Sequence, residues 1–305
     1  MNLPARREAS AFPAIVPTAS NRAGDSRTDL DGIRPLEPAE FELIRQLAYR
    51  TFGLDLKPGK EELVSSRLRR LVAAAGFHSY REYYRHVVGD ATGKALCGMV
   101  DALATNHTAF LREPEHFEFL KREVLPLLSA REATEIWCAA CATGEEVWTL
   151  GFVLNDCKPA QRTCIRASDI SNNALQFASR ALYSADRCRD LPGSWLSRYF
   201  TPEQGSPFGY RVVPAVRAQA SFHRINLIEP LPWTRTFPLI FCRNVMIYFD
   251  GATQERVVRQ LSDCLEPGGF LIVGHAETLT AISHSLEYVQ PAVYRKPGRR
   301  GRSRK

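Results

Sequence analysis

The chain has 305 residues, of which 45% are hydrophobic and 24% charged, as expected for a globular protein of one or two domains. No stretch approaches the roughly 18 consecutive apolar residues that cross a bilayer. The net charge is +7, but seven of the 40 basic residues follow Tyr294, and the rest of the chain has 33 basic and 33 acidic residues. We therefore expect a solvated basic tail at residues 297–305, and no nucleic-acid partner.

The eight cysteines are scattered singly, mostly within apolar segments, where a free cysteine behaves as a small hydrophobic residue. This usage differs from the disulfide framework of a small secreted domain. Near the N-terminus, the apolar run from Phe12 to Val16 is short and contains Pro13, so it does not form the core of a signal peptide. We therefore expect a cytoplasmic protein.

Two regions of different character precede residue 105. Residues 1–34 are rich in Ala, Ser, Arg, Pro and Asp without periodicity, and we expect a disordered leader. Residues 35–104 show apolar positions at helical spacing, separated by Gly and Pro, which predicts a small all-α domain. The predicted apolar stripes comprise Phe41, Ile44, Leu47 and Ala48; Leu63, Leu68, Leu71 and Val72; and Leu96, Met99, Val100 and Leu103.

Short apolar strands alternate with helices in residues 105–296, which predicts an α/β fold with a doubly wound, Rossmann-like parallel sheet. Aromatic and β-branched residues flank a turn rich in Gly, Pro and Ser at about 187–221, where we expect an inserted small antiparallel β subdomain. The predicted strands are Glu135–Ala139, Cys164–Ser168, Leu239–Cys242 and Phe270–Gly274. The predicted helices are Glu146–Leu154, Asn172–Leu182 and Thr253–Leu265.

Ligands of such sheets bind beyond the carboxyl ends of the strands, near the point where the strand order reverses. The loop after the first predicted strand, Cys141–Glu146, has small residues that allow close approach to the backbone. It lacks G-x-G-x-x-G and carries two carboxylates where a pyrophosphate would need positive potential. A cofactor with a cationic amino acid end suits this loop, which disfavours NAD and favours S-adenosylmethionine.

Polar residues also follow two later strands. Asp169 lies 25 residues beyond Gly144, close to the spacing of a carboxylate that binds ribose hydroxyls. Its alternative role is that of an N-cap for the next helix. Arg243 and Asn244 end an apolar run, where unpaired burial would be costly, so they indicate a ligand or a helix cap.

Together these segments resemble the CheR-type chemotaxis receptor (protein-glutamate) O-methyltransferases. The resemblance covers about residues 36 to 295, and the ordered set of motifs is far more specific than any one of them. The motifs are SRLRRL (Ser66–Leu71), TNHTAFLRE (Thr105–Glu113), ATGEE (Ala142–Glu146), ASDIS (Ala167–Ser171), INL (Ile225–Leu227), FCRNVMIYFD (Phe241–Asp250) and GHAE (Gly274–Glu277).

The resemblance implies that residues 105–296 form a methyltransferase domain that binds S-adenosylmethionine and releases S-adenosylhomocysteine. The substrates would be glutamate carboxylates of methyl-accepting receptors, converted to methyl esters. The implied cofactor-binding residues are Asn106, Thr108, Arg112, Glu146, Asp169, Asn226, Leu227, Arg243 and Asn244. The implied catalytic residues are Arg112 and Tyr248.

Glutamate, with a pKa of about 4.3, is already a nucleophile at neutral pH, and the sequence shows no obvious Cys/His metal cluster. We therefore expect no metal and no general base, with catalysis resting on in-line positioning and desolvation. In this hypothesis Arg112 and Tyr248 orient the attacking carboxylate, while Asn106 and Arg243 hold the site closed.

The expected partner is the cytoplasmic domain of a methyl-accepting chemotaxis receptor. Arg67, Arg69 and Arg70 are expected to face an acidic receptor helix, although an ordinary solvated helix face has the same pattern. The β subdomain could add a C-terminal peptide of the receptor as an edge strand. We expect the protein to be a monomer.

Three other functions fit parts of the sequence. Trp137–Cys141 has the W-C-x-x-C pattern of thiol–disulfide oxidoreductases, but Cys138 lies within a predicted strand rather than at a helix start. A nucleic-acid methyltransferase would share the fold, yet the loop Arg243–Met246 differs from the Asn/Asp-Pro-Pro-Tyr/Phe loop of base methylation. A non-catalytic scaffold that senses the cofactor is the third alternative.

Overall fold

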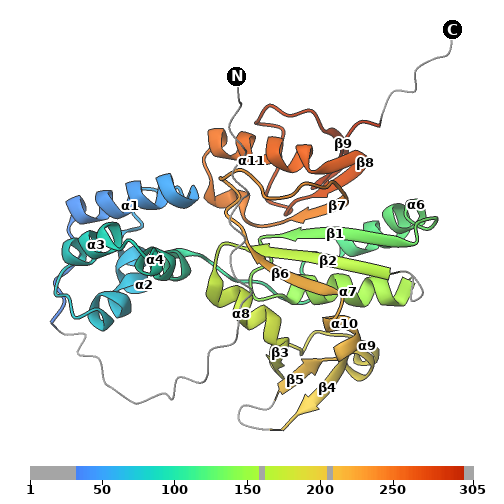
Figure 1. Ribbon diagram of the computed structural model, residues 1–305, viewed down its shortest axis with the longest axis horizontal. Helices are drawn as coiled ribbons and strands as arrows, with labels where there is room; N and C mark the ends of the chain where they lie inside the picture. Colours follow the sequence, from blue (N-terminus) through green and yellow to red (C-terminus); the bar gives the residue numbers. More distant parts are fainter. Residues whose placement is uncertain (1–31, 158–161, 205–208, 299–305) are drawn as a thin grey trace, which may run out of the picture.

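The computed structural model describes residues 32–157, 162–204 and 209–298 (Figure 1). Apart from residues 32–34, the predicted leader lies outside these ranges, and so does the basic tail beyond Gly298. The described helices are all too short or too polar to cross a membrane.

The first part of the described chain is a cluster of helices that lies beside the main sheet (Figure 1). The helices are α1 (Pro38–Phe52), α2 (Glu61–Ala74), α3 (Tyr80–Gly89) and α4 (Lys94–Leu103). Their apolar faces meet in one core that contains Ile44, Leu68 and Met99, each fully buried. The prediction that Leu63 belongs to the buried stripe is wrong, because its side chain is 39% exposed. The buried positions of α2 are Val64, Leu68 and Val72, which lie on one face of the helix at i, i+4 and i+8.

The predicted α/β fold class is confirmed by a seven-stranded, mostly parallel sheet in the order β6-β2-β1-β7-β8-β10-β9. Strands β6, β2, β1, β7 and β8 run parallel, while β10 pairs antiparallel with β8 and β9. The strand order reverses at β1, whose neighbours are β2 and β7, so the crevice beyond its carboxyl end is the expected ligand site. The strands are β1 (Ala133–Ala139), β2 (Arg162–Asp169), β6 (Ala220–Arg224), β7 (Phe237–Cys242), β8 (Leu265–Ile272), β9 (Glu287–Gln290) and β10 (Val293–Arg295).

Helices cover both faces of this sheet, which explains why the central strand β7 is apolar and buried along its whole length. Alternate residues of β1 point to opposite faces: Ile136 joins one core and Trp137 the other. The Ile136 core contains residues of α7 (Glu145–Cys157), α8 (Asn172–Arg180) and the segment formed by α5 (Glu115–Phe119), the π-helical turn η1 (Leu120–Val124) and α6 (Leu125–Leu127). The Trp137 core contains residues of α11 (Gly251–Asp263).

The antiparallel β subdomain is a three-stranded sheet in the order β3-β5-β4, at the lower edge of Figure 1. It begins earlier than the expected residue 187, because α8 ends at Ala181 in a left-handed conformation (φ 52°) and β3 follows at once. Ser221, expected within it, lies in β6 of the main sheet, paired with Arg166. Its elements are β3 (Leu182–Ser184), α9 (Gly193–Tyr199), β4 (Phe200–Glu203), β5 (Gly209–Val212) and α10 (Pro214–Arg217).

The end of α1 attaches the helical domain to the sheet domain. Gly53 ends α1 in a left-handed conformation (φ 75°), and a Cβ there would lie 2.8 Å from the Ile228 side chain. The main-chain N–H of Asp55 donates to the carbonyl of Tyr248 at 2.9 Å. These contacts bring Phe52 and Leu54 to the carboxyl ends of the strands, where they line a cavity.

Candidate active site at the carboxyl ends of the strands

A cavity of about 920 Å³, including the part open to solvent, lies between the helical domain, the linker after α4 and the ends of β1, β2 and β7. Every residue assigned from the sequence to cofactor binding or catalysis lines it. These residues are Asn106, Thr108, Arg112, Glu146, Asp169, Asn226, Leu227, Arg243, Asn244 and Tyr248.

The loop after β1 lines this cavity with Ala140, Cys141 and Ala142. Ala140 (φ 58°) and Ala142 (φ 47°) both adopt left-handed conformations, which are strained for residues with a side chain. Gly144 (φ 94°) then starts α7, and a Cβ there would lie 2.7 Å from the Cβ of Ala178 and 2.9 Å from the Tyr183 hydroxyl. Only glycine therefore lets α7 pack this closely on α8 and the β subdomain.

Asp169, at the end of β2, organises two loops at once. Its carboxylate accepts hydrogen bonds from the N–H groups of Ala142 at 2.8 Å and Ser171 at 2.9 Å. The N-cap of α8 is Ser171, whose hydroxyl accepts from the N–H of Ala174 at 3.0 Å, so Asp169 is not the cap. Burial raises the pKa of Asp169 above its usual value, although these N–H groups oppose the shift.

Arg243 lies at the centre of a buried charge cluster with Glu113 and Glu146. Its guanidinium donates to Glu146 at 2.6 Å, to Glu113 at 2.9 Å and to the carbonyl of Arg112. The Arg243 side chain is only 1% exposed. Burial disfavours ionisation of Glu113, but its hydrogen bond and ion pair with Arg243 hold the pKa of this carboxyl below the usual value.

Glu113 was not assigned to the site from the sequence, and neither was the buried Glu277. Glu277 accepts hydrogen bonds from the N–H groups of Gly274, Asn244 and Met246 at 2.6, 2.7 and 2.6 Å, and from that of Ile247 at 3.3 Å. It thus fixes the loop after β7, in which Asn244 is left-handed (φ 58°). Glu113 ends the motif TNHTAFLRE and Glu277 ends the motif GHAE, and these positions were the sequence signal that could have identified both residues.

The linker between the two domains forms another wall of the cavity. The Asn106 amide donates to the Ser171 hydroxyl at 3.3 Å, which ties the linker to α8. The Arg112 guanidinium donates to the carbonyl of His107 at 2.9 Å and is partly exposed. Thr108 lines the cavity between them.

The remaining predicted residues lie on the side nearest to the helical domain. The Asn226 amide donates to the carbonyl of Thr51 at 2.8 Å, so it joins the domains as well as lining the cavity. The carbonyl of Leu227 accepts from the Gln260 amide at 3.0 Å. Tyr248 belongs to the short 3₁₀ helix η2 (Met246–Tyr248), and it is partly exposed at the cavity.

The three arginines of α2 differ in their surroundings. Arg67 donates to the carbonyl of Leu103 at 2.6 Å and to the Thr105 hydroxyl at 3.0 Å. It therefore holds the start of the linker, one residue before Asn106. Arg69 is partly buried and Arg70 is exposed.

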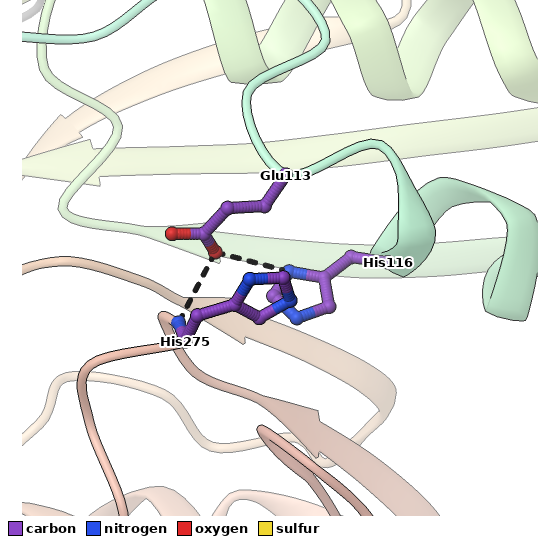
Figure 2. Close-up of side chains that lie close together, drawn as sticks. All are labelled: Glu113, His116 and His275. Atoms are coloured by element: carbon purple, nitrogen blue, oxygen red, sulfur yellow. Dashed lines mark hydrogen bonds and ion pairs between the residues drawn. The ribbon is translucent and has the colours of Figure 1, made fainter.

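Glu113 also contacts two histidines (Figure 2). Its Oε2 atom lies 3.4 Å from Nδ1 of His116 and accepts from the main-chain N–H of His275 at 3.3 Å. His116 is 1% exposed. Burial, followed by the nearby Arg243, lowers the pKa of His116 to about 4, so its ring is neutral at pH 7.

Cys138 and Cys141 give no support to the oxidoreductase alternative. Both are free and buried, and burial raises the pKa of each thiol well above its usual value. The Cys138 thiol donates to Glu146 at 3.2 Å. A thiolate nucleophile requires the opposite environment, exposed and with a lowered pKa.

Family models match almost all of the described chain. The model described as "CheR methyltransferase, SAM binding domain" matches residues 106–294, and that described as "CheR methyltransferase, all-alpha domain" matches residues 39–104. The two matches meet at the linker that lines the cavity.

Curated relatives are similar over nearly their full lengths. A chemotaxis protein methyltransferase of Borreliella burgdorferi is 33% identical over 84% of this chain and 94% of its own. One of Klebsiella aerogenes is 34% identical over 91% of this chain and 96% of its own. Chemotaxis protein methyltransferase 2 of Pseudomonas aeruginosa is 35% identical over 84% of this chain and 92% of its own.

Proposed function

The chain belongs to the CheR methyltransferase family, the S-adenosylmethionine-dependent methyltransferases of chemotaxis, and we propose that it methylates glutamate carboxylates of chemotaxis receptors. The products would be glutamate methyl esters and S-adenosylhomocysteine. The observation that carries the proposal is the juxtaposition of Asp169, Glu146 and the strained Ala140–Ala142 backbone around one cavity.

The residues present fit a nucleoside with a cationic amino acid end. Glu146, which is also paired with Arg243, lines the cavity with a carboxylate that is suited to an ammonium group, and Asp169 has lone pairs that can accept from ribose hydroxyls. Leu227 and Phe52 offer apolar surface to the base, and Asn226 lies beside them. When bound, S-adenosylmethionine supplies a methyl carbon on a positively charged sulfur, open to attack by a carboxylate without proton transfer.

Arg112 and Tyr248 are the proposed catalytic residues. Both line the cavity and are partly exposed, so an incoming glutamate can reach them. The guanidinium and the phenol can each donate a hydrogen bond to a carboxylate oxygen and hold it in line. Arg243 is committed to Glu113 and Glu146, so its role is to keep the wall of the cavity in place rather than to touch substrate.

The proposed partner is the cytoplasmic domain of a methyl-accepting receptor. Arg70 offers an exposed positive charge on α2 for an acidic helix of that domain. A receptor tail could add to the β subdomain as a further strand. We propose a monomer without a bound nucleic acid, and no metal takes part in the proposed transfer.

A transfer assay tests the proposal. Purified protein is incubated with tritiated S-adenosylmethionine and membranes that contain chemotaxis receptors, and labelled receptor is then treated with alkali. Release of labelled methanol from the receptor identifies a carboxyl ester. Label that is stable to alkali, or that appears on added nucleic acid instead, would refute the proposed reaction.

Replacement of Arg112 tests the catalytic assignment. Arg112→Ala should lower kcat at least about 100-fold while the affinity for S-adenosylhomocysteine changes much less, because the group that orients the carboxylate is lost. Arg122→Ala, at an exposed position of η1, is the matched control and should leave kcat unchanged. If Arg112→Ala keeps near-normal kcat, Arg112 does not belong to the catalytic set.

A further inference from the structure

Glu113, His116 and His275 form a cluster beside the cavity that the proposed methyl transfer does not use (Figure 2). Each residue offers one ligand atom, and these three atoms all lie within 4.8 Å of one another. Glu113 and His116 come from the segment that enters α5, and His275 comes from the loop after β8. Within the described ranges, this is the one group of three such residues that could share an ion.

The burial of His116 requires an explanation. Its side chain is 1% exposed, yet neither ring nitrogen has a hydrogen-bond partner among the described residues. A buried imidazole without partners loses its hydrogen bonds to water and gains none in return, which is unfavourable. Its Nδ1 atom lies 3.4 Å from the Glu113 carboxylate, and a ring nitrogen of a neutral imidazole is a common metal ligand. A cation between them would satisfy both groups.

We propose that Glu113, His116 and His275 bind a divalent transition metal ion of the zinc class. Two imidazole nitrogens and one carboxylate oxygen are a ligand set that zinc and its neighbours in the first transition series prefer, whereas magnesium and calcium prefer oxygen alone. Zinc bonds to nitrogen and oxygen are about 2.0–2.2 Å long, so bound ligand atoms stand about 3.4 Å apart. Side-chain rotation of His275, which is exposed, can close the present separation.

The surroundings of the cluster match those of a metal site. The carboxylate of Glu113 is oriented by Arg243 at 2.9 Å and by the Asn244 amide at 3.3 Å, as outer-shell groups orient a ligating carboxylate. The charge of Arg243 is balanced by Glu146, so it does not stand alone beside the ion. Exposed His275 leaves a path for the ion and a position for water. The bound ion would fasten α5 to the loop after β8.

Metal titration tests this site. The result is independent of the proposed methyl transfer, because zinc binding is measured without cofactor or receptor. Tag-free protein is stripped with chelator and titrated with zinc by calorimetry, with thermal unfolding as the second readout. Wild type should bind one zinc ion and show a raised Tm. His275→Ala, at an exposed position that folding tolerates, should weaken binding at least 10-fold and abolish the rise in Tm.

Two controls make the outcome specific. His284→Ala removes a histidine outside the cluster and should bind zinc as wild type does. Cobalt(II) in place of zinc should give a spectrum without thiolate charge-transfer absorption, which excludes binding by the cysteines. Zinc binding that survives both His275→Ala and His116→Gln, or no binding by wild type, would overturn the proposal and leave His116 a buried, unligated ring.

Discussion

Two sides of the cavity use the same kinds of polar residue in different ways. On the β1–β2 side (the loops Ala140–Glu146 and Asp169–Ser171), Asp169 accepts hydrogen bonds from nearby main-chain N–H groups and lines the cavity. On the β7–β8 side (the loops Arg243–Tyr248 and Gly274–Glu277), Glu277 accepts hydrogen bonds from main-chain N–H groups of both loops. Asp169 therefore keeps hydrogen-bonding capacity for a ligand, whereas Glu277 uses its capacity to hold its own loops together.

This difference shows that a motif can be characteristic of a family because its residues stabilise the fold, rather than because they bind a ligand. FCRNVMIYFD is one of the motifs that carry the resemblance, yet its Arg243 is buried between two carboxylates. Substitutions on the β7–β8 side should therefore reduce stability first, and substitutions on the β1–β2 side should reduce cofactor affinity first.

The largest effect is expected for Arg243→Met. It leaves the carboxylates of Glu113 (partly buried) and Glu146 (buried) without their cation, which should lower the free energy of unfolding by about 3–5 kcal/mol. Urea denaturation measures this loss. The control is Arg259→Met, which removes a surface ion pair with Glu255. The Arg259 side chain is 70% exposed, so this change should lower the free energy of unfolding by under about 1 kcal/mol. If both variants are equally stable, the ion pairs of Arg243 with Glu113 and Glu146 do not stabilise the β7–β8 side.

A smaller loss of stability is expected for Gly274→Ala. The added Cβ would lie 2.4 Å from the Asn244 amide nitrogen and 2.9 Å from a Glu277 oxygen, so the two loops must separate. Such overpacking costs about 1–3 kcal/mol. Gly251→Ala, at the first position of α11 with no atom within 4 Å, is the control, and it should be neutral or slightly stabilising. A Tm of Gly274→Ala that equals that of the control would contradict the close packing.

The sequence predicted the centre of the sheet and missed its edges, for a physical reason. Strands β1, β7 and β8 each contain a buried apolar run that stands out without knowledge of its partners, whereas β2 mixes buried apolar residues with charged ones. Strand β6 is only partly buried along its length, and β9 and β10 are short, so their pairing could be recognised only in three dimensions. The same holds for Leu63 and Val64, where adjacent apolar residues compete for one buried position of α2.

The sequence identified residues that lie together at one cavity, but not the contacts that they make with one another. The chosen residues all line one cavity, because loops at the carboxyl ends of parallel strands share one edge of the sheet. The pairing of Arg243 with Glu113 joins residues 130 positions apart, and no spacing rule in the sequence encodes it. The cofactor-binding and catalytic roles themselves stay predictions.

Asp169→Asn tests the β1–β2 side. Loss of a charged acceptor for the ribose should weaken binding of S-adenosylhomocysteine by about 10- to 100-fold. Stability should change little, because relief from burying a charge offsets one weakened hydrogen bond to the backbone. Calorimetry with S-adenosylhomocysteine and thermal unfolding measure the two effects, and Asp263→Asn, at an exposed position, is the control. A large loss of stability with unchanged affinity would place Asp169 with the structural carboxylates of the β7–β8 side.

The smallest effects are expected on α2, and they extend the comparison to the helical domain. Arg70 is exposed, so Arg70→Glu should raise KM for receptor several-fold and leave cofactor affinity unchanged. Arg67 was expected to behave in the same way, but it holds the carbonyl of Leu103 and the hydroxyl of Thr105. Arg67→Ala should therefore also weaken S-adenosylhomocysteine binding, because the linker that carries Asn106 loses its support.

Receptor methylation kinetics and calorimetry, measured for both α2 variants, separate these roles. The effect of Arg70→Glu should fade at high salt, because screening removes the attraction between exposed charges. The effect of Arg67→Ala on cofactor affinity should persist there, because hydrogen bonds to a partly buried linker are screened less. If the two variants respond alike to salt in both measurements, Arg67 acts in docking alone, and the contact between α2 and the linker has no influence on the cavity.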